Sequence, residues 1–407
     1  MHVLDMLKER GFIAQVTFED DLYKALEREP MTFYLGIDPT ADSLHVGHFM
    51  PIIVAGYLQR AGHRPIILCG GGTAMIGDPS GKSDLRKMMS RETIGENVCG
   101  IQKQLSRFLD FSDGKAIMAN NGDWLLNLNY IDFLREVGAL FSVNRMLTAE
   151  CYKRRMETGL TFLEFNYMLM QSYDFLQLFK NYGCRLQIGG DDQWSNMLSG
   201  ADLIRRKEHE DAFALTCKLI MTHDGKKMGK TEKGALWLDP TRTTPFEFYQ
   251  YWRNVGDQDV ERFLSLLTLL PMDEVRRLGA LPGEQINEAK RVLAFEVTKM
   301  IHGEAEAQKA ADAALALFAG GAASQDVPTW EVNAAMLAED NRLTTLLASC
   351  GLCTSRGDAR KMVQQGAVLV ADQKVTDVDY RIDASQIGPD GLMLRKGKKN
   401  YCRLILK

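Results

Sequence analysis

Apolar runs alternate with amphipathic segments along the first half of the chain. Residues 32–38 and 65–69 are short apolar runs bounded by turn residues, which is typical of buried strands, and 46–61 between them is predicted as a helix. Further strands are expected at 115–119 and 185–188, and further helices around 92–109, 130–139, 161–180 and 194–206. The alternation predicts an α/β domain of about 220 residues with a doubly wound parallel sheet.

The second half of the chain has a different pattern. Residues 245–318 have an almost wholly helical periodicity and end in an Ala-rich segment. Residues 319–328 have the Gly, Ala, Ser and Pro content of a linker, and the chain beyond 341 is expected to form a small α+β module. We therefore expect domains at 1–224, 225–320 and 341–407, with a linker at 321–340.

Composition narrows the class of protein. The chain has 407 residues, of which 45% are apolar and 25% charged, which is ordinary globular usage and excludes a disordered or fibrous protein. It has no apolar run long enough for a membrane helix, and its start lacks the apolar segment of a secretion signal. We expect a soluble cytoplasmic protein without a membrane partner.

Cysteine usage agrees with that compartment. The eight cysteines are scattered along the chain and are expected to be reduced thiols. Only Cys350 and Cys353 have the spacing of a metal or redox pair, and no second pair accompanies them. We therefore expect no metal site, and the role of these two cysteines is left open.

Charge is unevenly distributed along the chain. Residues 341–407 contain 12 Lys and Arg against 6 Asp and Glu and so carry +6, while the net charge of the whole chain is −4. A basic module on an acidic body can bind a polyanion locally. A solvated charged face is the alternative that charge alone leaves open.

The loop after the first predicted strand is the strongest candidate for a ligand site, because open parallel sheets bind ligands at the carboxyl ends of their strands. His45 and His48 lie three residues apart at the start of the next predicted helix, where backbone N–H groups favour an anion such as a triphosphate. Gly47 between them leaves room for a flat base to approach the backbone.

The Gly-rich segment after the second predicted strand is not a P-loop. Gly-Lys-Ser at 81–83 needs a glycine at position 76 to complete that motif, and the residue there is Ile76. The segment still offers Asp78 for an ammonium or hydroxyl group, and Lys82 and Arg86 for phosphate. A simple turn at Asp78 is the alternative.

A basic, glycine-flanked loop, KKMGKT, occupies residues 226–231. Such a loop can close over phosphates and bring lysine charge to a transition state. Taken alone, it is more often a solvated turn.

These segments together resemble the class I aminoacyl-tRNA synthetases, which carry a His-x-Gly-His element before a lysine-rich loop of this kind. Three further segments narrow the resemblance to the bacterial tyrosyl-tRNA synthetases: Tyr34 with Gly36 and Asp38, then YMLMQSYD at 167–174, and QIGGDDQW at 187–194. The resemblance extends over nearly the whole chain, to RKGKKNY at 395–401, with mild departures at Val46 and in the lysine loop.

The resemblance implies a Rossmann-like catalytic domain that activates L-tyrosine with ATP to tyrosyl-adenylate and then transfers tyrosine to the 3′ end of tRNA(Tyr). Mg²⁺ would enter with ATP as co-substrate, and no permanently bound cofactor is implied. The nucleotide-binding residues would be Gly36, Asp38, Gly47, Gly190, Asp192 and Lys230. The residues that would assist the reaction are His45, His48, Thr40, Lys227, Lys230, Thr231, Lys82 and Arg86.

The tyrosine pocket that the resemblance implies lies largely on one predicted helix. Its residues would be Tyr34, Asp78, Tyr167, Gln171, Asp174 and Gln193. The spacing of Tyr167, Gln171 and Asp174 agrees, because it places all three on one helix face. Seen in isolation, the same spacing would equally suit a helix packed into the core. Tyr34 and Asp174 would bind the phenol and reject phenylalanine, so no editing domain is expected.

The C-terminal module resembles the small RNA-binding domain shared with a ribosomal small-subunit protein. The residues that would contact tRNA phosphates are Arg356, Arg360, Lys361, Lys396, Lys398 and Lys399. Enzymes of this subgroup are usually homodimers, and apolar helices near 124–147 are compatible with a second copy as partner.

Two alternatives to this reading stay open. One is a nucleotidyltransferase built on the same His and Lys elements, which gives no reason for Tyr34, Asp174 and the basic module. The other is a non-catalytic RNA-binding protein, against which the intact His45, His48 and Lys230 weigh.

Overall fold

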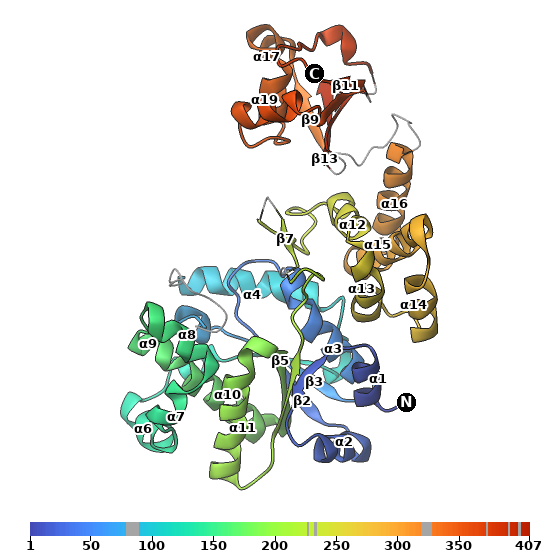
Figure 1. Cartoon of the computed structure of the whole chain (residues 1–407). Coiled ribbons are helices and arrows are strands. Elements are labelled where there is room, and N and C mark those ends of the chain that lie inside the picture. Colours follow the sequence, from blue (N-terminus) through green and yellow to red (C-terminus); the bar gives the residue numbers. More distant parts are fainter. Residues whose placement is uncertain are drawn as a thin grey trace. The chain divides into compact units, whose positions relative to one another are not determined.

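The computed structural model describes residues 1–78, 89–225, 228–231, 234–318, 328–371, 373–389, 391–397 and 400–407, with side chains except at 154, 158, 230, 231, 317 and 318. The chain forms two compact units (Figure 1): Met1–Thr243 with Gly256–Ala280, and Thr244–Val255 with Leu281–Lys407. The first unit contains the large sheet. The second contains three helices and the C-terminal module.

A six-stranded sheet with the order β1-β6-β5-β2-β3-β4 forms the centre of the first unit. Neighbouring strands from β6 to β4 run parallel, and β1 pairs antiparallel with β6. The strands are β1 (Ile13–Val16), β2 (Thr32–Ile37), β3 (Arg64–Cys69), β4 (Ile117–Asn120), β5 (Cys184–Gly190) and β6 (Phe213–Cys217). The chain leaves β2 toward β3 and β4 on one side and resumes at β5 on the other. The topological switch point, where such sheets bind ligands, therefore lies between β2 and β5.

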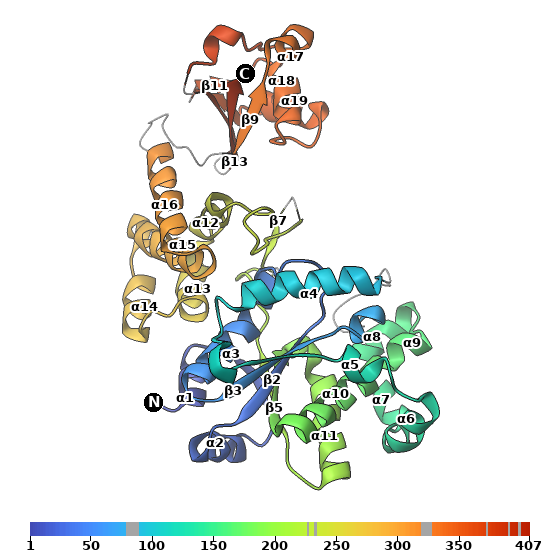
Figure 2. The ribbon, with the colours of Figure 1, turned by 180° about the vertical axis from the view of Figure 1, so that it is seen from behind.

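Helices cover both faces of this sheet, as the opposite views in Figures 1 and 2 show. The main ones are α3 (Phe49–Arg60), α10 (Tyr167–Tyr182) and α11 (Trp194–Glu208). Tyr34, Ile66 and Leu68 of the strands form one core cluster with Phe175 of α10 and Leu203 of α11. Alternate strand residues face the opposite side, and α3 packs against β2, β3, β5 and β6.

The predicted strands and helices of this unit are confirmed, with shifts at their ends. The helix predicted at 46–61 begins as a tight 3-10 turn, η1 (Val46–His48), before it continues as α3. The helix predicted at 161–180 is two helices, α9 (Phe162–Phe165) and α10, which meet at Asn166. The sequence pattern missed β1 and β6, which have four and five residues.

Besides β4, α9 and α10, further helices occupy the connection between β3 and β5. They are α4 (Arg91–Leu105), α5 (Gly122–Leu125), α6 (Tyr130–Glu136), α7 (Val143–Leu147) and α8 (Glu150–Thr158). The Ser90 hydroxyl caps α4 by accepting the backbone N–H of Thr93. In both views α4 runs across one end of the sheet. Two later helices, α13 (Val260–Leu267) and α14 (Met272–Gly279), complete the unit.

The second unit begins with helices α12 (Pro245–Arg253), α15 (Ile286–His302) and α16 (Glu304–Phe318). Its C-terminal sheet has the order β11-β10-β12-β13-β9. The strands are β9 (Thr329–Val332), β10 (Val368–Val370), β11 (Gln373–Val375), β12 (Leu392–Lys396) and β13 (Asn400–Leu406), and the helices are α17 (Ala334–Glu339), α18 (Leu343–Ser349) and α19 (Arg356–Gln364). The α+β module is thus confirmed.

The segment predicted as a linker, 321–340, contains β9 and α17 within its described part. Strand β9 pairs in parallel with β13, so it belongs to the C-terminal sheet. The domain boundaries themselves stay a prediction. Among the described residues, no helix has the length and apolar character that a membrane span requires.

Candidate active site

A cavity of about 620 Å³ lies at the carboxyl ends of β2 and β5. The parallel strands bring to this one edge side chains that are far apart in the sequence. The predicted site residues that line it are Tyr34, Gly36, Asp38, Thr40, His45, Gly47, His48, Asp78, Tyr167, Gln171, Asp174, Gly190, Asp192 and Gln193. Lys82, Arg86 and Lys227 lie outside the described residues, and only the backbones of Lys230 and Thr231 are described.

The deep end of the cavity contains Tyr34 and Asp174, which are 1% and 2% exposed. The Asp174 carboxylate accepts hydrogen bonds from Asn121 Nδ2 at 2.9 Å and from Trp124 Nε1 at 2.7 Å. Burial raises the pKa of Asp174 to about 7, although these two donors oppose the shift. Burial also raises the pKa of Tyr34 well above its ordinary value.

Among the described residues, none hydrogen-bonds the buried hydroxyl of Tyr34. A buried hydroxyl without a partner is costly, and such groups usually meet water or a ligand. Tyr34 and Asp174 thus offer a donor and an acceptor to a molecule at this end of the cavity. A phenol, which has one O–H and lone pairs on the same oxygen, matches both.

A chain of hydrogen bonds connects this end of the cavity to Asp38. The Asp38 carboxylate accepts from the hydroxyls of Thr73 at 2.8 Å and Tyr167 at 3.1 Å, and Asn121 donates to Thr73 at 3.0 Å. A Cβ added at Gly70 would lie 2.1 Å from the Asp38 carboxylate, so the Gly-rich segment is needed for this close approach.

Helix α10 presents Tyr167, Gln171 and Asp174 to the cavity, as their spacing predicts. Both polar atoms of the Gln171 amide are hydrogen-bonded, which orients the side chain. Asn196 Nδ2 donates to Gln171 Oε1 at 2.9 Å, and Gln171 Nε2 donates to Gln193 Oε1 at 3.4 Å. The oxygens of Tyr167 and Gln171, with the carboxylate of Asp78, which also lines the cavity, are acceptors suited to an ammonium group.

Sequence reasoning missed Asn121, Trp124, Thr73 and Asn196. Asn121 directly follows β4, and Thr73 lies in the loop after β3. Both therefore lie at the same edge of the sheet as the predicted residues. Their position directly after a parallel strand could have predicted them as site residues. Trp124 and Asn196 are set by tertiary packing and carry no such signal.

The His45–His48 turn is internally hydrogen-bonded. His45 Nδ1 accepts from the Gly47 backbone N–H at 3.0 Å, and His48 Nδ1 accepts from the His45 backbone N–H at 3.2 Å. The rings stack with their centroids 4.1 Å apart. Because each Nδ1 is an acceptor, a neutral imidazole at either position carries its proton on Nε2.

Glycines permit close backbone approach beside the histidine turn and at the end of β5 as well. A Cβ at Gly47 would lie 2.7 Å from the His45 ring, and one at Gly190 would lie 2.6 Å from the Asp192 carboxylate. The neighbouring Asp191 accepts from Thr216 at 2.8 Å, whereas Asp192 lines the cavity. Asp192 is therefore the carboxylate of this pair that can meet a ligand.

The lysine loop is joined to the histidine turn through the backbone. Strands β7 (Lys230–Thr231) and β8 (Gly234–Ala235) pair, and the segment after them lies beside the turn. The Val46 N–H donates to Leu236 O at 3.0 Å, and the Leu238 N–H donates to Leu44 O at 2.9 Å. The structure thus brings together the two motifs that the sequence separates.

The predicted tRNA-binding residues lie in the C-terminal module. Arg356, Arg360 and Lys361 are exposed on α19, and Lys396 ends β12, whereas Lys398 and Lys399 lie outside the described residues. Within the described residues, Cys350 and Cys353 form no disulfide. In the described parts of the chain, no group of three or more His, Cys, Asp or Glu side chains could hold a metal ion.

The chain is similar to known proteins along nearly its whole length. The family of class I tRNA synthetases (W and Y) matches residues 26–319, and the tyrosine–tRNA ligase SYY-like C-terminal domain matches residues 321–404. The tyrosine–tRNA ligase of Clostridium botulinum (strain 657 / Type Ba4) is 58% identical over 100% of both chains. That of Lachnoclostridium phytofermentans is 60% identical over 98% of both chains.

Solved structures are similar too. A C-terminally truncated mitochondrial tyrosyl-tRNA synthetase of Aspergillus nidulans is 29% identical, with a TM-score of 0.69 over 78% of this chain and 94% of that chain. The corresponding enzyme of Coccidioides posadasii is 30% identical, with a TM-score of 0.66 over 77% and 91%. The chain therefore belongs to the tyrosine–tRNA ligase family, within the class I aminoacyl-tRNA synthetases.

Proposed function

We propose that this chain activates L-tyrosine with ATP and then charges tRNA(Tyr) in the cytoplasm. In the first step a tyrosine carboxylate oxygen attacks the α-phosphate of ATP, and the bond to pyrophosphate breaks to leave tyrosyl-adenylate. In the second step a terminal ribose hydroxyl of the tRNA attacks the tyrosyl carbonyl and releases AMP. The observation that carries the proposal is one cavity with a donor–acceptor pair for a phenol at its closed end and the histidine turn along its wall.

Tyrosine recognition would use the pair Tyr34 and Asp174. The substrate phenol donates to the Asp174 carboxylate, whose orientation Asn121 and Trp124 hold, and accepts from the Tyr34 hydroxyl. Phenylalanine would leave both groups unpaired, and sites of this kind reject such an analogue by about 10⁴–10⁵-fold, a range for which tyrosyl-tRNA synthetases are themselves the standard example. Asp78, Tyr167, Gln171 and Gln193 would hold the ammonium end.

ATP would lie against the histidine turn, with Mg²⁺ entering as part of the co-substrate. The Nε2–H groups of His45 and His48 would donate to the nucleotide, Gly36, Asp38, Gly47 and Gly190 would line its seat, and Asp192 would bind the ribose. The carboxylate nucleophile is already ionised at neutral pH. Catalysis would therefore rest on alignment and on charge stabilisation at the phosphate oxygens.

Charge stabilisation at the phosphate oxygens would come from Thr40, Lys227, Lys230 and Thr231. Lys82 and Arg86 would be further cations for pyrophosphate. Thr40 lines the cavity. Backbone hydrogen bonds from the Val46 N–H to Leu236 O and from the Leu238 N–H to Leu44 O join the segment after the lysine loop to the histidine turn. The lysine charges would be most useful in the transition state, where negative charge develops on the leaving group relative to bound ATP.

Transfer to tRNA would also need the C-terminal module and a second copy of the chain. The exposed Arg356, Arg360 and Lys361, with Lys396, Lys398 and Lys399, would contact phosphates. A homodimer is supported by large apolar side chains that are more than half exposed on neighbouring short helices of the first unit, among them Tyr130, Ile131, Val143, Met156 and Phe162.

Tyrosine-dependent exchange of labelled pyrophosphate into ATP tests the proposal. We expect exchange with tyrosine and none above background with phenylalanine. Exchange that requires a different acid would assign another specificity. The absence of exchange with any amino acid would favour a non-catalytic RNA-binding role.

A further inference from the structure

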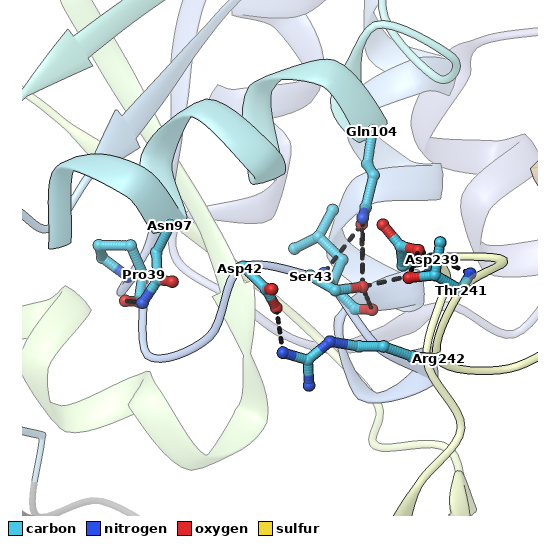
Figure 3. Close-up of polar contacts among 9 residues, drawn as sticks. Pro39, Asp42, Ser43, Asn97, Gln104, Asp239, Thr241 and Arg242 are labelled. Atoms are coloured by element: carbon cyan, nitrogen blue, oxygen red, sulfur yellow. Dashed lines mark hydrogen bonds and ion pairs between the residues drawn. The ribbon is translucent and has the colours of Figure 1, made fainter. Parts of the chain in front are cut away.

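Helix α4 lies against the loop of residues 39–44, which leads from β2 to the histidine turn (Figure 3). Asn97, Gly100 and Gln104 are spaced at i, i+3 and i+7, which places them on one face of the helix. Asn97 and Gln104 are each only 7% exposed. We call the three residues the α4 face. None of them lines the 620 Å³ cavity.

The α4 face contacts the loop at both of its ends. Asn97 Nδ2 donates to Pro39 O at 2.8 Å, next to Thr40, and Gln104 Oε1 accepts from the Leu44 N–H at 2.9 Å, next to His45. Buried hydrogen bonds of this kind strongly restrict the groups that they join.

Gly100 allows the helix to approach the middle of the loop. A Cβ added there would lie 2.1 Å from the backbone oxygen of Asp42, a separation that a real Cβ does not reach. The obstructing atom belongs to the backbone, so an alanine at 100 could fit only if the helix or the loop moved. Gly95, on the same helix, has no atom within 4 Å of its added Cβ.

The other side of the loop is joined to the segment that follows the lysine loop. Ser43 is 3% exposed, and its hydroxyl accepts from Gln104 Nε2 at 3.1 Å and from the Asp239 N–H at 3.2 Å. Arg242 pairs with Asp42 at 2.5 Å. As Figure 3 shows, the loop is thus enclosed between α4 and residues 239–242.

We propose that the α4 face, acting with Ser43, is a positioning element that sets the histidine turn relative to the lysine loop. This inference rests on the proposed function, because it assumes that adenylate formation uses both motifs. The residues would act through alignment of the reacting groups, since a displacement of about 1 Å can lower a rate about 100-fold. Tyrosine binding depends on α10, Tyr34 and Asp174 and would be largely spared.

The two glycines of α4 provide a matched test. Gly100→Ala and Gly95→Ala add the same methyl group to the same helix, but only the first displaces the loop. For Gly100→Ala we expect adenylate formation, followed as pyrophosphate exchange at saturating tyrosine, to slow by about 10- to 100-fold, with a tyrosine Kd within about threefold of wild type. Gly95→Ala should keep the wild-type rate and an equal or higher Tm, because alanine favours helix.

A second pair covers the case in which Gly100→Ala does not fold. Gln104→Met removes the amide that holds Leu44 and Ser43, and Gln250→Met is its control, since Gln250 is equally buried at 7% exposure on α12 of the other unit. Only the first should show the slow adenylate step with near-normal tyrosine binding.

Two outcomes would overturn the inference. The first is a rate of adenylate formation within about twofold of wild type in Gln104→Met or in a folded Gly100→Ala. The second is an equal loss of this rate and of tyrosine affinity, which indicates general damage to the protein. If the wild-type protein itself gave no tyrosine-dependent exchange, the proposed function would fail first. The two failures are therefore distinguishable.

Discussion

The indole Nε1 of Trp124 donates a hydrogen bond of 2.7 Å to Oδ1 of Asp174, a carboxylate that is 2% exposed. The donor stabilises the charged form, while burial stabilises the protonated form more strongly, and the resulting pKa of Asp174 is about 7. The group that would accept the substrate phenol thus titrates near neutral pH in the ligand-free protein.

Tyrosine affinity should therefore depend on pH. The phenol would donate to the ionised carboxylate, so protons compete with tyrosine, and the affinity should fall as the pH drops through about 7, by up to about tenfold per unit. Equilibrium binding of tyrosine between pH 5.5 and 8.5 measures this, with Asp174→Asn as a control that binds more weakly and without the dependence. A flat wild-type profile would contradict the assignment.

Trp124→Phe should move that profile to higher pH. The substitution removes a donor that lowers the pKa of Asp174, and a hydrogen bond to a charged group contributes about 1.5–3 kcal/mol. Tyrosine affinity at pH 7 should fall by about tenfold and recover in part at pH 8.5. Trp252→Phe, at a buried tryptophan of the second unit, is the control and should leave the profile in place.

Tyr34→Phe should weaken selection without weakening the fold. The substitution removes a buried hydroxyl that has no partner among the described residues, and such a group costs about 1–3 kcal/mol. The ligand-free variant should melt at the same or a higher temperature, while its preference for tyrosine over phenylalanine in kcat/KM drops by at least about tenfold. Tyr152→Phe is the matched control, because the buried Tyr152 hydroxyl donates to Phe165 O at 2.8 Å and its loss should lower Tm. Unchanged selectivity in Tyr34→Phe would remove Tyr34 from the phenol site.

Lys230→Ala should slow adenylate formation by about 10²–10³-fold and leave the tyrosine Kd within about twofold, because its contact would be made mainly in the transition state. Single-turnover kinetics and equilibrium binding separate the two effects. Lys24→Ala, at an exposed lysine, controls for loss of charge. A normal turnover for Lys230→Ala would refute the role of the loop.

Removal of the C-terminal module should separate the two steps of the reaction. Because β9 pairs with β13, the cut belongs after residue 318 and not after 340, which would leave β9 without its partner strand. The truncated chain should form adenylate at a near-normal rate and fail to charge tRNA. Parallel loss of both activities would show that the module is not separable.

Most of the fold and the inner part of the site could be predicted from the sequence. Strands β2, β3 and β5 are predictable because they are buried runs between turn residues, and Tyr167, Gln171 and Asp174 because helical spacing and the family motif coincide. Strand β9 was not predictable, since only Val332 of its four residues is buried and the segment therefore has no apolar run. The same holds for Trp124, Asn97 and Gln104, whose partners are set by tertiary contacts and not by any local pattern.

The structure of the protein with bound tyrosine and a non-hydrolysable ATP analogue tests the central claim most directly. We predict that the phenol oxygen lies within hydrogen-bonding distance of Tyr34 Oη and the Asp174 carboxylate, and that the amino-acid carboxylate faces the α-phosphate beside His45 and His48. A phenol bound elsewhere, or an α-phosphate out of reach of the carboxylate, would contradict it.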